Sequence, residues 1–591
     1  MPLYLGRRTT RNTRSKHMHT SYFTHNPKSP LKRLGGILSI LICIGCTGGG
    51  RRQATISLSD LRSRLQPLTG LGTYAGFAPT TGVLYMGNDV IDRRMRLGKE
   101  THRMQTIRYT YKPSGQNYID LPSEEFRFRI GDIYFSGEGD LLTYDSYQIL
   151  QKIGGVKQVV IQFTYISENE PKPSFHLWVH YEIYPDLPLI RKWMTVQNLT
   201  DSAFYLEDIA VESLSFFAAR VDSLQIWPYS VPEQPEEMQP PWAGGTTAVF
   251  VFVQDPGIDG GVVLGNESPG LLKHYQVYSN RDTVSIGLTP TTDANGTEIR
   301  VPPERSVNSC KVWTMLLGAS SQAAVETVIR NVVAYSLIRD EDSSSEMPEI
   351  RWAQLSPEGH VPVESPQQSD LIVFDYDWDI RHLEELKPIG QHVHENGGKL
   401  GIRLPIAEIR TAVLNRPAWR LTPVPMLFWR MAEADTRNAE SSVGRQEEGK
   451  KETGKERKAE QQRASDEADR VIYCILSDYG YYLAQAVKTL LEETAADVLI
   501  FDRPILGLPG SVLKGCKGFG HEHYTRAESI GAIYRWVFDF ADYLHGEYPH
   551  LQLGLTATAY GVAHPDAACF AHFDLFFDGL SLVGTASQPK W

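Results

Sequence analysis

The sequence lacks several features that would place it in common functional classes. Acidic residues outnumber basic ones by 70 to 59, and the formal net charge of -11 disfavours nucleic acid as a partner. The six cysteines (43, 46, 310, 474, 516 and 569) contain no repeated CxxC pair, so neither a zinc ribbon nor a disulfide scaffold is indicated. No apolar run reaches the roughly 20 residues that a membrane-spanning helix needs. A chain of 591 residues with 41% hydrophobic residues is expected to hold two large globular domains plus tails.

The first 46 residues resemble a bacterial lipoprotein signal. Residues 1–33 are basic and polar, and the apolar run that follows ends in small residues before Cys46. The resemblance implies that Cys46 is lipidated and anchors the chain to a membrane of the bacterial cell envelope, in the periplasm or at the cell surface. Cys43 stands where Leu is usual, and Met18 is an alternative start. An ordinary cleaved signal, which gives a secreted protein, and an uncleaved signal anchor are the alternatives.

Residues 47–340 are expected to form a large β domain. Short alternating or β-branched runs recur from residue 71 onward, for example at 125–130, 159–166 and 176–184, and turn residues separate them. Helical periodicity is scarce before residues 323–333. Many short strands of this kind predict a β-sandwich.

Two polar segments are expected to lie outside the folded cores. Residues 341–369 are rich in Pro and Ser and are predicted to be a linker. Residues 432–470 are dense in charged residues and Gln with little aliphatic content, which predicts a solvated, disordered insertion.

Residues 370–591 alternate between predicted strands and helices. The expected strands are residues 371–374, 399–404, 471–476, 498–501, 551–556 and 573–577, with helices at 380–396, 479–493 and 527–546. This α/β alternation predicts a parallel sheet of the (β/α)8 (TIM) barrel type. Because the sequence ends soon after the sixth strand, we expect a barrel that is incomplete at its C-terminus or closed in another way.

The strand at 498–501 ends on one carboxylate, Asp502. In parallel sheets, ligands bind at the carboxyl ends of the strands, so this position suits a catalytic group. An Asp that caps the following turn through its side chain is the alternative.

Several segments carry motifs of one enzyme family. Residues 176–209 contain a strand, a Pro185-Asp186-Leu187-Pro188 turn and a strand with Arg191-Lys192-Trp193. This segment resembles the N-terminal, galactose mutarotase-like supersandwich of the family 36 α-galactosidases. The sequences DYDW (375–378), HENGGKLGIR (394–403) and IFD (500–502) match barrel motifs, with Tyr376, Asp377 and Arg403 replacing family residues. The resemblance implies a sandwich packed on a TIM barrel. Another exported β-sandwich with a Pro-bracketed turn is the alternative.

The resemblance also implies residue roles. Asp502 corresponds to the nucleophile, and Asp578 best fits the acid/base by its spacing, with Asp574 as the alternative. The expected substrate-binding residues are Asp375, Asp377, Trp378, Arg403, His521 and His523. Packing in the core is an equally open interpretation of Trp378. No cofactor is implied.

Cys516, His521 and His523 lie in a short segment, CKGFGHEH, that invites a metal interpretation. The sequence offers no evident fourth ligand, so we expect these histidines to line a sugar site and predict no metal.

These inferences predict an exported retaining glycoside hydrolase acting on α-galactosides or related α-glycosides, with an oligosaccharide or glycan as its substrate. Such an enzyme needs two carboxylates about 5–5.5 Å apart. The alternative is a catalytically degenerate, carbohydrate-binding relative. A sugar mutarotase would follow from the sandwich alone and leaves the attached α/β domain unexplained.

Overall fold

The computed structural model describes most of the chain between residues 72 and 589. The described residues are 72–98, 103–167, 172–185, 187–216, 224–229, 237–244, 248, 250–258, 260–268, 272–277, 283–291, 296–318, 349–353, 370–376, 378, 380–410, 414–420, 470–502, 516–518, 520–556, 572–578, 581–585 and 588–589. Cys46, Asp377, the predicted helix at 323–333 and all but the last residue of the charged insertion lie outside them.

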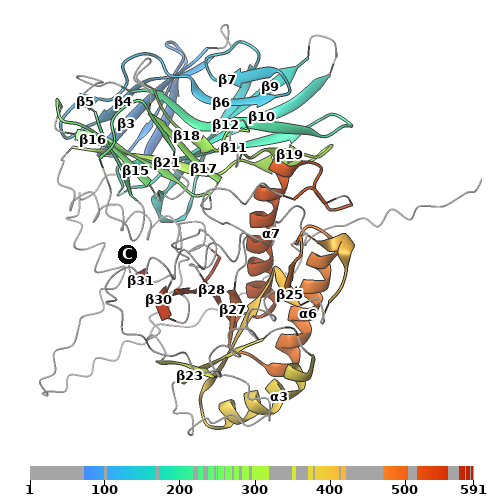
Figure 1. Cartoon of the computed structure of the whole chain (residues 1–591). Coiled ribbons are helices and arrows are strands. Elements are labelled where there is room, and N and C mark those ends of the chain that lie inside the picture. The colour runs from blue at the N-terminus through green and yellow to red at the C-terminus, as the bar shows by residue number, and fades with distance from the viewer. Residues whose placement is uncertain are drawn as a thin grey trace, which may run out of the picture. The chain divides into compact units, whose positions relative to one another are not determined.

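The described residues 72–318, which we call the sandwich region, form three antiparallel sheets, as the strand pattern predicted (Figure 1). The five-stranded sheet contains β1 (Tyr74–Ala78), β2 (Val83–Gly87), β3 (Ile91–Leu97), β4 (Met104–Tyr111) and β5 (Gln116–Asn117). The nine-stranded sheet runs β13 (Gln225–Tyr229), β15 (Phe250–Asp255), β16 (Gly260–Asn266), β21 (Val312–Leu317), β11 (Leu189–Asn198), β10 (Pro173–Ile183), β9 (Lys157–Ile166) and β8 (Thr143–Gln151), with β20 (Ser306–Asn308) paired to β11. The seven-stranded sheet runs β14 (Trp242–Gly244), β17 (Lys273–Val277), β18 (Thr283–Leu288), β12 (Phe204–Ser215), β6 (Glu125–Ile130) and β7 (Ile133–Ser136), with β19 (Ile299–Val301) paired to β12. A 3-10 turn, η1 (Ile153–Gly155), links β8 to β9.

The β10–β11 hairpin shows how the sequence pattern produces the sandwich. Leu177, Val179 and Tyr181 of β10 are fully buried, while Trp178 and His180 between them are partly exposed. The strands pair with His180 opposite Trp193, and the side-chain amide of Asn88 donates to carbonyls of the connecting turn. The predicted strand, turn and strand are therefore confirmed.

Four charged side chains are buried between the sheets of the sandwich region. Arg93 from β3 and Lys192 from β11 contact Glu125 from β6 and Glu212 from β12, at 2.7–3.1 Å, and none is more than 1% exposed. Burial alone would raise the pKa of Glu125, but the adjoining Arg93 and Lys192 charges outweigh it and hold that pKa at about 2. We call these four residues the charge network. Its two cations and two anions compensate each other.

The described residues 349–589, which we call the α/β region, contain an eight-stranded sheet. Its order is β22 (Glu349–Ala353), β23 (Asp370–Asp375), β24 (Lys399–Pro405), β27 (Val498–Asp502), β28 (Gln552–Thr556), β29 (Leu575–Asp578), β30 (Ser581–Thr585) and β31 (Gln588–Pro589). β22 to β29 are parallel, whereas β30 and β31 are antiparallel to their neighbours. The helices are α3 (Ile380–Glu395), α6 (Asp478–Thr494) and α7 (Arg526–Glu547), with a 3-10 turn, η4 (Pro417–Trp419).

The structure corrects two expectations for this region. β22 lies inside the predicted linker and pairs in parallel with β23. The predicted strand at 471–476 is not part of the parallel sheet: β26 (Arg470–Ile472) pairs antiparallel with β25 (Glu408–Arg410), and β24 pairs directly with β27. The short apolar run at 471–476 instead contributes side chains to the core. Tyr473 and Cys474 are fully buried and belong to the same hydrophobic cluster as residues of α6.

The described strands form an open sheet and not a complete barrel. Six parallel strands agree with the predicted α/β class, and the sheet then continues through the β29–β30 hairpin instead of a helical crossover. Within the described part of the chain, no helix combines the length and apolar character required to cross a bilayer.

Candidate functional site

The carboxyl edge of the parallel sheet gathers several of the predicted site residues. Asp375 ends β23 and lies opposite Arg403 of β24, and Asp502 ends β27 opposite Pro405. Arg403 donates from Nε and Nη2 to the two carboxylate oxygens of Asp375, at 2.6 and 2.8 Å. The side chain of Asp375 is 53% exposed and that of Arg403 18%, so solvent reaches this bidentate pair. Polar groups of adjacent parallel strands thus meet at one edge, as the sequence predicted.

Asp502 is held by the next strand. β27 is buried along Val498 to Phe501, and Asp502 is its first partly exposed residue. The hydroxyl of Thr556, at the end of β28, lies 2.8 Å from Oδ1 of Asp502 and 2.9 Å from the carbonyl oxygen of Phe501. A hydroxyl donates one proton, so Thr556 serves one of these acceptors at a time. The contact fixes the orientation of the Asp502 carboxylate.

The two candidate acid/base residues lie at opposite ends of β29. Asp578 is the last residue of β29, so its backbone is at the same edge as Asp502. Asp574 precedes the strand, where its Oδ2 accepts from the backbone N–H of Leu553 at 2.8 Å and lies 2.9 Å from Nε2 of His545. Asp574 therefore lies at the amino edge of the sheet, away from Asp502. This position does not suit the alternative acid/base role, and the contacts of Asp574 instead hold β28, β29 and α7 together.

Trp378 is a packing residue in this structure. Its side chain is 6% exposed, its indole N–H donates to the carbonyl oxygen of Pro405 at 2.7 Å, and its ring meets that of Tyr376 at 5.6 Å. Tyr376, which replaces an Asp of the family motif, is equally buried. Trp378 consequently secures the end of β24 beside Asp502, and the core-packing interpretation describes it better than sugar stacking.

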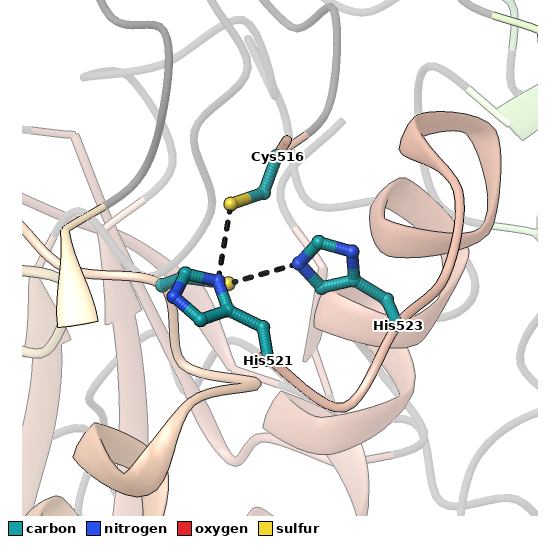
Figure 2. A group of neighbouring side chains, drawn as sticks. Cys516, His521 and His523 are labelled. Carbon is teal, nitrogen blue, oxygen red and sulfur yellow. Dashed lines mark hydrogen bonds between the residues drawn. The ribbon is translucent and has the colours of Figure 1, made fainter. Parts of the chain in front are cut away.

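His521 and His523 belong to a compact group of sulfur and imidazole side chains (Figure 2). One ligand atom from each of Cys474, Cys516, His521 and His523 lies within 4.8 Å of the others. Sγ of Cys516 is 3.3 Å from Nδ1 of His521, and Sγ of Cys474 is 3.7 Å from Nε2 of His523. We call these four residues the Cys/His group. Cys474 is the fourth member of the group. The sequence predicted only a small buried side chain at this position.

The Cys/His group is shielded from solvent. Both cysteines are fully buried and His523 is 6% exposed, whereas His521 is partly exposed. The hydrogen bond with Cys516 and burial raise the pKa of the Cys474 thiol well above its usual range. The hydrogen bond between Cys516 and His521 raises the pKa of the His521 imidazole. The group can hold a metal ion, and its position does not suit the sugar-lining role predicted for the histidines, because one imidazole and both thiols are buried.

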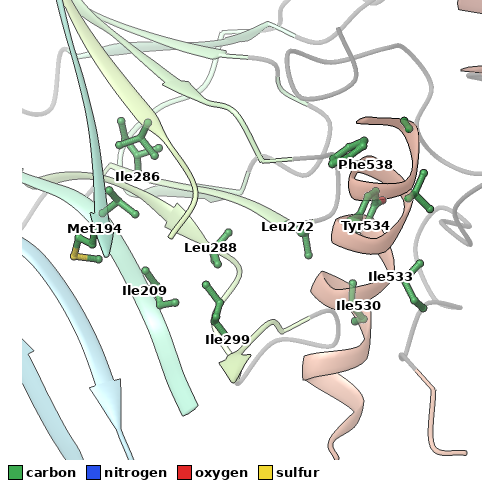
Figure 3. Packing of buried hydrophobic residues seen from close by; sticks show 14 of the residues in the cluster. Met194, Ile209, Leu272, Ile286, Leu288, Ile299, Ile530, Ile533, Tyr534 and Phe538 are labelled. Atoms are coloured by element: carbon green, nitrogen blue, oxygen red, sulfur yellow. The ribbon is translucent and has the colours of Figure 1, made fainter. Parts of the chain in front are cut away.

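Helix α7, which follows the Cys/His group in the chain, also packs on the sandwich region. Its N-cap residue Thr525 donates its hydroxyl to Glu298, which precedes β19, and Arg300 lies over the ring of Tyr524. Ile530 and Tyr534 of α7 belong to the same buried cluster as residues of β18 and β19 (Figure 3). Farther along α7, the ring of Phe540 stacks on Phe501 of β27 at 5.9 Å. One helix therefore connects the sandwich region to the strand that carries Asp502.

A hollow of about 710 Å³ lies on the five-stranded sheet. Its lining includes Tyr74, Tyr85, Asp92, Arg94 and Lys112. The ammonium of Lys112 lies 4.5 Å from the centre of the Tyr74 ring, and Arg94 is paired with Asp92. This hollow is formed by residues other than those at the carboxyl edge of β27.

The structure resembles solved α-galactosidases along most of the chain. The galactosidase domain of the α-galactosidase–sucrose kinase AgaSK matches with a TM-score of 0.56 and 12% identity, covering 85% of this chain and 74% of that one. The GH36 α-galactosidase AgaB from Geobacillus stearothermophilus matches with a TM-score of 0.56 and 11% identity, covering 85% and 75%. An α-galactosidase from Lactobacillus brevis matches with a TM-score of 0.53 and 11% identity, covering 81% and 70%. No protein-family model and no curated protein sequence matches this chain.

The resemblance inferred from the sequence motifs is therefore confirmed at the level of the fold. Two functional positions were missed. Thr556 is a polar residue that ends a predicted strand, and this signal was available because its strand neighbours the one ending in Asp502. Cys474 had no such signal, since only the folded chain brings it to Cys516.

Proposed function

We propose that the chain is a retaining glycoside hydrolase that cleaves α-galactosides or related α-glycosides, with Asp502 as nucleophile and Asp578 as acid/base. The observation that carries the proposal is the position of Asp502 at the carboxyl end of its strand, oriented by Thr556, on a fold shared with α-galactosidases. In α/β barrels, catalytic groups lie at this edge.

The proposal places one demand on the carboxyl edge of the sheet. β27 and β29 flank β28, so their backbones are separated by two inter-strand steps of about 4.8 Å each. The register pairs Phe501 with Leu555 and Thr556 with Phe577, so Asp502 is level with Phe577 and Asp578 lies one residue farther along. Because successive side chains of a strand point to opposite faces, the end of β29 has to turn the Asp578 carboxyl toward Asp502 to give the separation of about 5–5.5 Å that a retaining enzyme requires.

The reaction takes place in two steps. A carboxylate oxygen of Asp502 attacks the anomeric carbon while the Asp578 carboxyl gives its proton to the leaving oxygen, so that a glycosyl ester forms and the glycosidic bond breaks. Asp578 then takes a proton from water, whose oxygen attacks the same carbon and releases Asp502. Each step inverts the anomeric centre, and the product keeps the substrate's configuration. The hydroxyl of Thr556, 2.8 Å from Oδ1, helps to orient the Asp502 carboxylate for this attack.

The exposed Asp375–Arg403 pair is the proposed contact for sugar hydroxyls. Its carboxylate oxygens and guanidinium face solvent at the same edge and supply both acceptors and donors. Variants of AgaA from Geobacillus stearothermophilus have been crystallised with raffinose and with stachyose, so these oligosaccharides are suitable first substrates.

The deciding experiment measures hydrolysis of aryl α-glycosides and raffinose by the purified protein and by Asp502→Asn. We expect the variant to lose about 10³-fold or more in kcat, because the nucleophile is lost while the carboxamide keeps the shape of the side chain. Asp574→Asn, which changes a carboxylate at the opposite edge, is the matched control and should keep most of its kcat. NMR of the first-formed product should show the α-anomer.

Two results would contradict this proposal. Equal kcat values for Asp502→Asn and the unchanged protein would exclude Asp502 as nucleophile. Binding of raffinose in calorimetry without turnover of any α-glycoside would favour the catalytically degenerate, carbohydrate-binding alternative.

We further propose that the protein is exported and anchored through lipidated Cys46. The support is the basic, apolar and small-residue pattern of the first 46 residues. Cys46→Ala should move the protein from the membrane fraction to the soluble fraction of an expressing bacterium. An unchanged distribution would contradict the lipid anchor.

A further inference from the structure

We propose that Cys474, Cys516, His521 and His523 bind one Zn²⁺ ion and form a structural site. Cys474 lies between β26 and α6, and the other three residues lie between β27 and α7. The four side chains thus come from two segments that are far apart in the sequence. This inference is independent of the proposed hydrolase activity.

The distances within the group fit tetrahedral coordination. Zinc binds thiolate sulfur at about 2.3 Å and imidazole nitrogen at about 2.0–2.1 Å, so neighbouring S and N ligands stand about 3.6 Å apart around the ion. The S···N separations are 3.3 Å between Cys516 and His521 and 3.7 Å between Cys474 and His523, and all four ligand atoms lie within 4.8 Å of one another. An ion at their centre therefore needs only small side-chain adjustments.

Hydrogen bonds around the group orient the ligands for a cation. Nε2 of His521 lies 2.9 Å from the carbonyl oxygen of Ala418 in η4, and a carbonyl only accepts, so Nε2 carries the proton. Nδ1 of His521 then presents its lone pair to Cys516. A ligating histidine with its other N–H bonded to a carbonyl is the usual arrangement around protein-bound zinc.

One of the two sulfurs also accepts a hydrogen bond from the backbone. The N–H of Gly518, two residues after the cysteine, donates to Sγ of Cys516 at 3.2 Å. This contact fixes the direction of one ligand atom of the group.

The ligand types select the ion. Two thiolates and two imidazoles suit Zn²⁺, whereas Ca²⁺ and Mg²⁺ prefer oxygen ligands. Four protein ligands complete a tetrahedron and leave no position for water or substrate, which is the arrangement of structural zinc sites. The burial of both cysteines and of His523 excludes bulk water from the ion.

The site would join two segments of the α/β region. The Cys474 segment leads into α6, which is capped by Ser477, and the segment with the other three ligands leads into α7, which is capped by Thr525. Cys474 N–H also donates to Trp419 of η4, so both sides of the group are bonded to the same 3-10 turn. The ion would therefore fix the chain that follows the Asp502 strand against the start of α6, with no direct part in chemistry.

The test measures the zinc content of the purified full chain by elemental (inductively coupled plasma) mass spectrometry. We expect one Zn²⁺ per chain, and less than one tenth of that in Cys474→Ser and Cys516→Ser. Cys310→Ser is the matched control, because Cys310 lies in the sandwich region outside the group, and this variant should keep its zinc. His523→Cys offers a replacement ligand and should also retain zinc, which distinguishes ligation from a general effect of substitution on folding.

Cobalt substitution supplies an independent spectroscopic readout. Co²⁺ bound in place of zinc should show the strong visible bands of tetrahedral thiolate coordination, and His523→Cys should shift them. Absence of zinc from protein purified with zinc in every buffer, together with no tetrahedral cobalt spectrum, would overturn the proposal. A Cys474–Cys516 disulfide in freshly purified protein, seen as two thiols protected from alkylation until a reductant is added, would overturn it as well.

Discussion

The charge network of the sandwich region and the Cys/His group of the α/β region are both buried polar clusters, but they are stabilised in different ways. The network sets Arg93 and Lys192 against Glu125 and Glu212, so each charge has an opposite charge within 3.1 Å. The Cys/His group brings together two thiols and two imidazoles, all of which can donate an electron pair to a metal. The first cluster is complete within the protein, whereas the second acquires its full stability from a bound cation.

The two clusters also differ in the backbone that carries them. The network residues lie on β3, β6, β11 and β12, whose ladders fix their positions. The Cys/His residues lie in segments between a strand and a helix, where fewer backbone hydrogen bonds constrain the chain. A cation in the second cluster would supply the constraint that sheet pairing supplies in the first.

The largest effect on stability is expected from breaking the charge network. Lys192→Met removes one cation and leaves a buried carboxylate without full compensation, which should lower the free energy of unfolding by about 3–5 kcal/mol. Chemical denaturation measures the loss. Lys387→Met, in the exposed pair with Glu493, is the control and should cost at most about 0.5 kcal/mol. Equal losses in the two variants would show that the network contributes no more than a surface pair.

A somewhat smaller effect is expected from removing zinc. If free zinc stands at about 100 times its dissociation constant, chelation should lower the free energy of unfolding by about 2.7 kcal/mol. The loss should be absent in Cys474→Ser and unchanged in Lys192→Met, because distant, independent sites have additive effects. A chelator effect of the same size in Cys474→Ser would contradict the distinction between the two clusters.

The smallest effect concerns a single partly buried titratable side chain, His180. Burial lowers the pKa of His180 to about 4, its ring stacks on Trp193 at 4.7 Å, and its nitrogens contact Gln158 and Thr195. Glu182 opposes this shift, while Lys152 and Lys311 add to it. Between pH 6.5 and 4 the unfolded chain binds the extra proton, so stability should fall as the pH is lowered through this window. Partial exposure of the ring limits the contribution to about 1–2 kcal/mol.

His180→Phe keeps the aromatic contact with Trp193 and removes the titrating group. Denaturation curves at pH 7 and pH 4.5 should therefore differ less for this variant than for the unchanged protein. An identical pH dependence would assign the acid sensitivity to other groups. The charge network should contribute little above pH 4.5, because the pKa of Glu125 is lowered from its ordinary value of 4.5 to about 2, so its contribution to stability is lost mainly below pH 4.5.

Local patterns in the sequence predicted the elements whose burial is regular. Alternation along residues 176–184 predicted β10, and the uninterrupted apolar run at 498–501 predicted β27 and the position of Asp502. Motif matches then predicted the fold shared with α-galactosidases, together with Asp375 and Arg403 at one edge of the sheet. Such inferences succeed because strand periodicity and the carboxyl end of a strand are properties of short segments.

Other features were decided by contacts between distant segments. β22 was read as linker and β26 as a barrel strand, because both are short and their pairing partners, not their composition, determine which sheet they join. Spacing in the sequence favoured Asp578 over Asp574, and the direction of β29 then placed the two residues at opposite edges of the sheet. The charge network and the Cys/His group depend on the same principle. The local sequences around Lys192 and Cys474 contain no signal for either cluster. Only the tertiary structure brings Glu125 and Glu212 to Lys192, and Cys516, His521 and His523 to Cys474.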